Sequence, residues 1–221
     1  MNRTLAGSLL AGLVVFGAPA ANATVLSLAS EYNVYVLGNM NQTSDSEGRV
    51  AVAGNATLTN YGVGDRLPAG TTGNSLVVGG NLTYNGGQVF HGSTVYGGTL
   101  TGNFGSPNGT VSQGSGLDFA ATSSYLTTAS NYWGGLSSNG QTVEYYGGVR
   151  LIGTQSDLNV FTVSGDYLSK SWGVNIDAPV GSTVLINVTG DSSAFRNLGF
   201  SFEDINGDGK GTVSRQNVIY N

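Results

Sequence analysis

The chain has 221 residues, of which 36 are Gly, 4 are Pro and none is Cys, and only 10% are charged. The absence of Cys excludes disulfide-stapled scaffolds and thiolate metal sites, so the chain must bury one sizeable apolar core. Asp and Glu outnumber Lys and Arg by 13 to 8 without any basic cluster, which excludes nucleic-acid binding.

The first 23 residues have the pattern of a secretory signal peptide. A basic start at Arg3 is followed by an apolar run over residues 5–16 and by the cleavage signature Ala21-Asn22-Ala23. The apolar run is shorter than the roughly 20 residues that span a bilayer. We therefore expect cleavage after Ala23, and a secreted mature domain over residues 24–221 that does not insert into membranes.

Two segments of the mature chain share a short apolar strand, a Gly-Asn corner and a second strand. They are residues 50–57 and 76–83, and Gly98-Thr99-Leu100-Thr101 repeats the corner. Looser copies follow at residues 163–168 and 188–191. Gly and Asn tolerate positive φ and so permit sharp corners. Strand–corner–strand units recurring about every 18–26 residues are typical of a parallel β-helix.

The fold class predicted from this repeat is all-β, a right-handed parallel β-helix. The alternative is an antiparallel sandwich, because Asn-Gly pairs are strong hairpin signals. Such pairs occur at residues 85–86, 108–109 and 139–140. Further strands are expected at residues 141–149, 160–164, 173–176 and 183–188.

One flanking α-helix is expected over residues 117–136, where the alternation of strands is lost. Apolar residues recur there at helical spacing, Asp118 lies near the start, and Gly134-Gly135 terminate the segment. We expect this helix to lie along the β-helix and to cover an apolar flank.

Few residues offer catalytic chemistry. The lone His91 is expected to be an exposed polar side chain before a corner. Asp45 and Glu47 would share one face of a strand, although their segment is also typical of a polar loop. The three residues Arg49, Arg150 and Arg196 are isolated in the sequence. We therefore predict no enzymatic activity, although parallel β-helices also include polysaccharide-cleaving enzymes.

A candidate calcium loop begins at Asp204. Asp204, Asn206 and Asp208 supply oxygen side chains at positions 1, 3 and 5 of a calcium-loop pattern, with Gly at position 6 and the Lys210 carbonyl at position 7. Position 12 is Arg215, where a bidentate Glu belongs. A Gly- and Asp-rich turn without metal explains the segment equally well.

The chain resembles the choice-of-anchor A family of bacterial exported proteins. The resemblance is strongest in ASEYNVYVLG (residues 29–38) and SDSEGRVAVAGN (residues 44–55), and weaker blocks extend it to residue 190. It implies a secreted, surface-displayed, adhesive β-solenoid that precedes a C-terminal anchor. No such anchor follows residue 221, so we expect a chain truncated at its C-terminus.

We therefore expect an adhesion or extracellular-matrix module that contacts extracellular polysaccharide, matrix, or a host or neighbouring cell surface. The alternative is an ice- or carbohydrate-binding solenoid, which regular Thr-x-Thr ladders would mark. Only residues 57–59 and 99–101 fit that pattern. Aromatic residues such as Tyr145, Tyr146 and Trp172 either stack on sugars or fill the core.

The signal-peptide pattern generates a first prediction. Mass spectrometry of protein recovered outside the cytoplasm should give an N-terminus at or near Thr24. Recovery of exported material that still begins at Met1 would contradict it.

Overall fold

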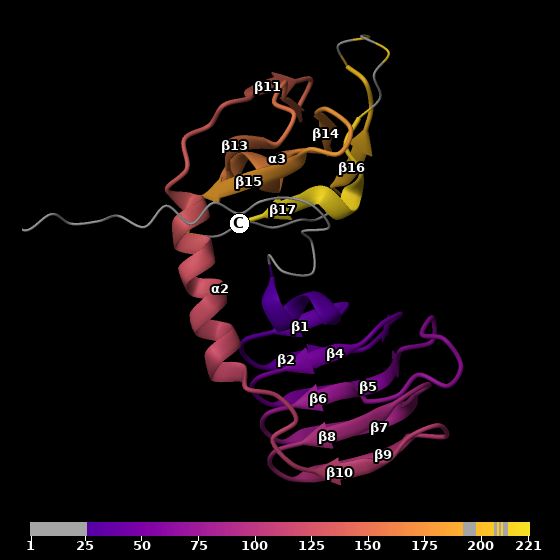
Figure 1. Cartoon of the computed structure of the whole chain (residues 1–221). Coiled ribbons are helices and arrows are strands. Elements are labelled where there is room, and N and C mark those ends of the chain that lie inside the picture. The colour runs from indigo at the N-terminus through magenta and orange to yellow at the C-terminus, as the bar shows by residue number, and fades with distance from the viewer. Residues whose placement is uncertain (1–25, 192–197, 206, 208, 210–211) are drawn as a thin grey trace, which may run out of the picture.

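The computed structural model describes residues 26–191, 198–205, 207, 209 and 212–221. Two stacks of mainly parallel strands make up most of the described chain, and a long helix runs between them (Figure 1). We call them the N-terminal stack (residues 34–113) and the C-terminal stack (residues 141–220). The prediction of a predominantly β fold with parallel sheets is confirmed.

The N-terminal stack consists of two sheets whose strands all pair in parallel. Successive strands mostly alternate between the two sheets, and a 3-10 helix η1 (Ser27–Glu31) precedes them. Sheet A has the order β1-β4-β6-β8-β10: Val34–Val36, Val50–Val52, Asn74–Val78, Ser93–Tyr96 and Val111–Gln113. Sheet B has the order β2-β5-β7-β9, with β3 also paired to β5: Met40–Gln42, Ala56–Val63, Leu82–Val89, Leu100–Gly105 and, for β3, Asp45–Ser46.

An apolar core fills the space between sheets A and B. Alternate residues of each strand point inward, and burying one large aliphatic side chain contributes about 1.5–3 kcal/mol. The cluster includes Val50, Val52, Leu58, Leu76, Val78 and Leu82, all fully buried. The two buried tyrosines of this layer are both paired. The Tyr84 hydroxyl donates to the Tyr61 carbonyl at 2.6 Å, and the Tyr61 hydroxyl is hydrogen-bonded to the Ser46 hydroxyl.

The predicted Gly-Asn corners carry a ladder of side-chain hydrogen bonds. The Asn55 N–H donates to the Asn39 Oδ1 at 2.8 Å, and the Asn81 N–H donates to the Asn55 Oδ1 at 2.8 Å. The Thr99 N–H donates to the Asn81 Oδ1 at 2.9 Å. The side-chain oxygen of each corner Asn thus accepts a hydrogen bond from the backbone N–H at the next corner. Asn39 extends the repeat one corner further toward the N-terminus.

The glycines at these corners are required for a reason other than the one predicted. Neither Gly54 nor Gly80 has a positive φ. A Cβ added at Gly54 would lie 2.8 Å from the Gly38 carbonyl oxygen, and one at Gly80 would lie 2.9 Å from the Gly54 carbonyl oxygen. Close backbone approach between successive corners, rather than left-handed geometry, therefore excludes a side chain there.

Helix α2 (Phe119–Gly134) lies within the predicted range 117–136. Asp118 caps its start, because its Oδ1 accepts a hydrogen bond from the Ala121 N–H at 2.9 Å. The helix covers less of the strands than predicted, since Thr122 is its only buried residue and its contact with sheet A is made by its first residue, Phe119. No helix in the described ranges is both long and apolar enough to cross a bilayer.

The apolar flank of sheet A is covered instead by the segment that leads into α2. A Cβ added at Gly116 would lie 3.2 Å from the Val95 side chain, and Phe119 packs on Tyr35 with ring centroids 5.7 Å apart. The side chains of sheet A beneath Gly116 are Val77 and Val95, and both are buried.

Two asparagines hold the end of α2 on the C-terminal stack. The Asn187 Nδ2 donates to the Trp133 carbonyl at 2.8 Å, and the Asn221 Nδ2 donates to the Ser130 carbonyl at 3.1 Å. These carbonyls lie in the last turns of the helix, where backbone acceptors lack helical partners or are open to a second donor. The helix is therefore a connector fixed at both ends (Figure 1).

The C-terminal stack also has two sheets and its own core. From β12 onward the strands alternate between the sheets and pair in parallel, whereas β11 pairs with β12 antiparallel. Sheet C has the order β11-β12-β14-β16: Gln141–Tyr145, Gly148–Ile152, Gly173–Asp177 and Gly199–Phe202. Sheet D has the order β13-β15-β17: Leu158–Ser164, Thr183–Thr189 and Val218–Tyr220. A 3-10 helix η2 (Arg215–Asn217) precedes β17.

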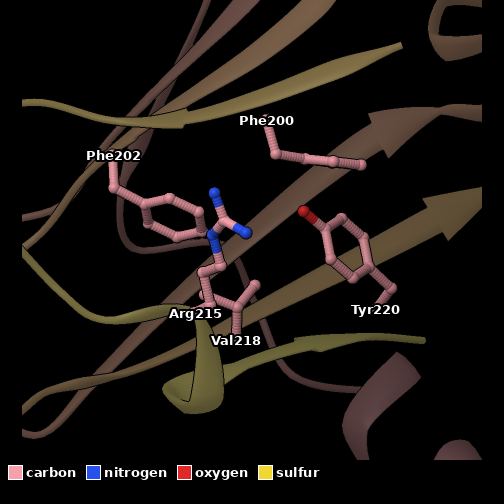
Figure 2. Close-up of a pocket in the computed structure, with 5 residues that line it drawn as sticks. All are labelled: Phe200, Phe202, Arg215, Val218 and Tyr220. Atoms are coloured by element: carbon pink, nitrogen blue, oxygen red, sulfur yellow. The ribbon is translucent and has the colours of Figure 1, made fainter. Parts of the chain in front are cut away.

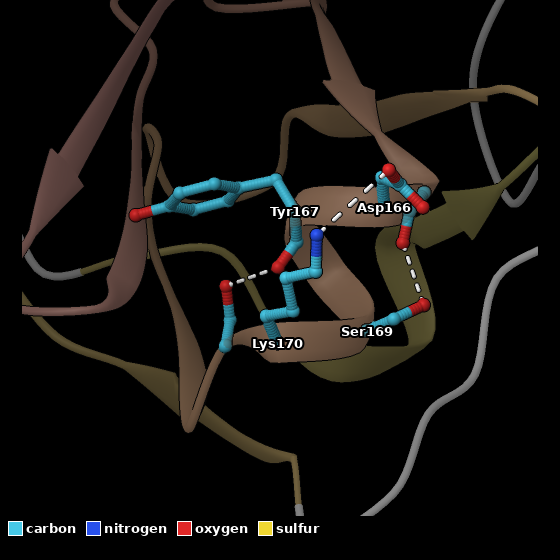
Figure 3. A network of polar contacts seen from close by, with 6 residues as sticks. Asp166, Tyr167, Ser169 and Lys170 are labelled. Atoms are coloured by element: carbon cyan, nitrogen blue, oxygen red, sulfur yellow. Dashed lines mark hydrogen bonds and ion pairs between the residues drawn. The ribbon is translucent and has the colours of Figure 1, made fainter.

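Two local predictions fail in this stack. Residues 163–168, expected to form a looser corner, instead end β13 and begin a second helix, α3 (Gly165–Lys170). Its first turn carries Asp166, whose carboxylate lies 3.9 Å from the Lys170 Nζ, an exposed pair that contributes little (Figure 3). Residues 141–149, expected to form one strand, form the β11–β12 hairpin.

The corner glycines generate a second prediction. Gly80→Ala should lower the free energy of unfolding by about 1–3 kcal/mol, because its Cβ would overlap the preceding corner. Gly38→Ala is the matched control, since it occupies the same place in the first corner with nothing within 4 Å of the added Cβ. That control should change stability by less than about 0.5 kcal/mol. Urea denaturation followed by circular dichroism measures both, and equal losses would contradict the close-approach explanation.

Candidate functional site: the outer face of sheet B

The outer face of sheet B carries two columns of polar side chains that run across its strands. Residues paired in register on parallel strands place their side chains next to one another on the same face. The first column consists of Asn41, Thr57, Thr83 and Thr101. The second column consists of Thr59, Asn85 and Asn103.

These seven residues, which we call the Thr/Asn grid, form a regular and uncharged surface. Neighbouring strands lie about 4.8 Å apart, and residues two apart along a strand lie about 6.7 Å apart. Thr83 is half-buried and the other six are exposed. The intervening side chains, Leu58 and Tyr84 among them, point into the core and hold the strands in place.

The grid differs from the Thr-x-Thr ladder considered from the sequence. Residues 57–59 do contribute two outward side chains, but Thr99 belongs to the corner. Its N–H and its hydroxyl both donate to the Asn81 Oδ1, at 2.9 and 3.1 Å. Strand register instead places Thr101 beside Thr83. The signal in the sequence is positional, because the residue two places after each corner Asn or Thr faces outward in the first column.

The candidate catalytic residues come from different strands and loops. The prediction that His91 is exposed is wrong, because the residue is half-buried between β7 and β8 and its Nδ1 is shielded from solvent. Asp45 and Glu47 are exposed, in and after β3. Arg49 donates from its Nη2 to the Thr72 carbonyl at 3.1 Å, and Arg196 lies outside the described residues. The described part of the chain holds no group of three or more His, Cys, Asp or Glu that could bind a metal.

A groove of about 300 Å³ lies where β16 and β17 end the C-terminal stack (Figure 2). Phe200 and Tyr220 meet edge to face across it, with ring centroids 5.3 Å apart, and burial raises the pKa of the Tyr220 phenol. The Arg215 guanidinium lies 5.8 Å from the centre of the Phe202 ring. The described residues that line the groove include no carboxylate or imidazole, so they provide no acid–base pair.

The predicted calcium loop is only partly described. Asp204 follows β16, and its Oδ2 accepts a hydrogen bond from the Gly209 N–H at 2.7 Å. Asn206, Asp208 and Lys210 lie outside the described residues. The buried carboxylate of Asp177 reaches the same loop, since its Oδ2 accepts from the Ile205 N–H at 2.9 Å. Asp177 is thus an acidic group, contributed by another strand, that the sequence alone did not place there.

Comparison with known families identifies the kind of domain. A family model described as "Putative Ice-binding-like adhesive domain" matches residues 25–221. The chain belongs to this family. The match supports the adhesive role implied by the resemblance to choice-of-anchor A proteins, at the coarser level of an adhesive domain. No curated protein and no solved structure matches the chain.

The acidic loop generates a third prediction. If the loop binds calcium, its affinity should be in the extracellular range of roughly 10⁻⁴–10⁻³ M. Calorimetric titration of the mature protein should then show heat that disappears in the Asp204→Ala, Asp208→Ala double variant. Absence of both heat and a thermal shift at millimolar calcium would leave only a metal-free turn.

Proposed function

We propose that this chain is a secreted or surface-displayed, non-catalytic adhesive domain that contacts external surfaces through the Thr/Asn grid of sheet B. The observation that carries the proposal is the alignment of Asn41, Thr57, Thr83 and Thr101 in one column beside a second column. The family match supports an adhesive role. The surfaces proposed are extracellular polysaccharide, matrix, and host or neighbouring cells.

The grid suits adhesion because its side chains are fixed before contact. Thr is β-branched and loses little χ1 freedom on binding, and the strands beneath are held by a packed core and by the corner ladder. Each hydroxyl or amide contributes a weak contact, so affinity comes from many contacts made together. Because the grid carries no charge, binding should depend little on salt.

Ice is the second candidate surface, and the same grid favours it. Polar Thr and Asn side chains repeat at fixed spacings in two directions, which suits a solid whose own atoms repeat regularly. The family description also names ice-binding-like domains. Partition of the protein into slowly growing ice separates this candidate from adhesion to polysaccharide.

We also propose the finer architecture, a right-handed parallel β-helix. The alternation of successive strands between two parallel sheets supports it, and parallel crossovers are right-handed in about 98% of cases. Attachment to a cell through a C-terminal anchor, as in choice-of-anchor A proteins, belongs to the same proposal. The absence of enzymatic activity is supported by the described lining residues of the Phe200 groove, which include no carboxylate or imidazole.

The grid generates a fourth prediction. Thr83→Tyr places a bulky ring in the middle of the first column and should weaken retention on the adhesive surface about tenfold, equivalent to 1.4 kcal/mol. The matched control is Thr189→Tyr, which makes the same change at an exposed strand position of sheet D. Both variants and the wild type are compared for retention on cellulose and chitin particles and for partition into ice. Equal retention of Thr83→Tyr and wild type on every surface would show that sheet B is not the contact face.

A further inference from the structure

Three exposed aromatic residues gather at the end of the β11–β12 hairpin. We call Tyr145, Tyr146 and Trp172 the aromatic cluster; they are 39%, 86% and 60% exposed. The two tyrosine rings meet edge to face with centroids 4.6 Å apart. Trp172 comes from the segment after α3, and its Nε1–H donates to the Tyr146 carbonyl at 2.8 Å. The fold thus joins aromatic side chains from two separate segments on one surface.

The indole of Trp172 is held in a fixed orientation. Its N–H is already hydrogen-bonded, and one side of the ring packs on the backbone of Gly148. A Cβ added at Gly148 would lie 2.8 Å from two atoms of the ring. Most of the residue nevertheless remains exposed, so the ring offers a rigid apolar surface that loses little entropy on contact.

The turn at Tyr146 is strained in a way that its own packing does not explain. Tyr146 and Gly147 form the two-residue connection of the hairpin, with φ of +46° and +79°. Such a turn favours Asn-Gly, because a bulky residue at positive φ is disfavoured. Tyr146 gains almost no burial in exchange. An outlier of this kind points to a role for the side chain outside the fold.

Polar groups lie beside the cluster on the outer face of sheet C. The Arg150 guanidinium lies 3.4 Å from the centre of the Tyr145 ring, and Arg150 pairs in register with Asn175. The Asn175 Oδ1 is shielded from solvent and accepts no hydrogen bond within the described ranges, while its Nδ2 donates to the Glu203 carboxylate at 3.0 Å. The surface therefore combines aromatic faces with the Arg150 guanidinium as a donor, while Asn175 holds the Glu203 carboxylate beside it.

We propose that the aromatic cluster, together with Arg150, binds the pyranose rings of a neutral polysaccharide. The C–H bonds on one face of a pyranose carry partial positive charge and meet the negative face of an aromatic ring, while hydroxyl groups reach the adjacent polar side chains. Neutral sugars fit better than acidic ones, because the chain has a net charge of −5 and Glu203 lies beside Asn175. The same negative charge disfavours anionic lipid as the ligand.

This inference rests on the proposed function only in assuming an extracellular adhesive domain. The site lies on sheet C, whereas the Thr/Asn grid lies on sheet B. The test is affinity electrophoresis of the mature protein in gels containing dextran, xylan or laminarin, with alginate as the acidic comparison. The wild type should be retarded by at least one neutral polysaccharide and less by alginate.

Two variants test the cluster, and a third serves as the control. Tyr146→Asn should weaken binding about three- to tenfold while leaving the unfolding temperature unchanged or raised, because Asn fits the turn better. Trp172→Ala should weaken binding about tenfold or more. Tyr132→Ala removes a 57% exposed tyrosine from α2 and should not change retardation.

Several outcomes would overturn the inference. They are the absence of retardation of the wild type by every neutral polysaccharide, retardation by alginate alone, unchanged binding in Tyr146→Asn, and an equal loss in Tyr132→Ala. Thr83→Tyr separates this site from the grid, because it should leave retardation by soluble polysaccharide unchanged. If Thr83→Tyr also left surface retention unchanged, the grid proposal would fail while the aromatic site would stand.

Discussion

The close approach of successive corners in the N-terminal stack is the constraint on which the Thr/Asn grid depends. Gly54 and Gly80 allow backbones to lie where a Cβ would overlap a carbonyl oxygen, and the Asn ladder then fixes one corner on the next. A fixed corner fixes strand register. Because side chains alternate with a period of two, a slip of one residue would turn Thr83 into the core and Leu82 outward. The regular outer face thus follows from the corners.

The parts of the fold that could be predicted from the sequence are those that local sequence patterns determine. The repeated Gly-Asn corners predicted the parallel strands of the N-terminal stack, and Asp118 marked the start of α2. The role of α2 was not predicted, because its position depends on two asparagines near the end of the chain. The hairpin at residues 141–152 was also missed, since its turn is Tyr146-Gly147 rather than Asn-Gly. Long-range pairing decided these features.

The candidate surfaces likewise depend on contacts between distant segments, which local sequence patterns do not predict. Residues 99–101 fit the Thr-x-Thr pattern, yet the Thr99 hydroxyl donates to the Asn81 Oδ1 in the corner. Only the strand register shows that Thr101 lies beside Thr83. The aromatic cluster depends on Trp172, which the chain delivers after an intervening strand and helix. The loop at Asp204 is a contiguous motif, so its pattern could be read from the sequence, although Asp177 could not be assigned to it.

The two proposed surfaces differ in the physics of their contacts. The Thr/Asn grid is flat and uncharged, and it depends on many weak contacts to a repetitive surface, whereas the aromatic cluster uses a few rigid rings. They lie on different stacks, joined by a helix fixed at both ends. Where one material reaches both surfaces, contact at the first raises the effective concentration of the second. Modest affinity at each surface would then suffice for the attachment proposed here.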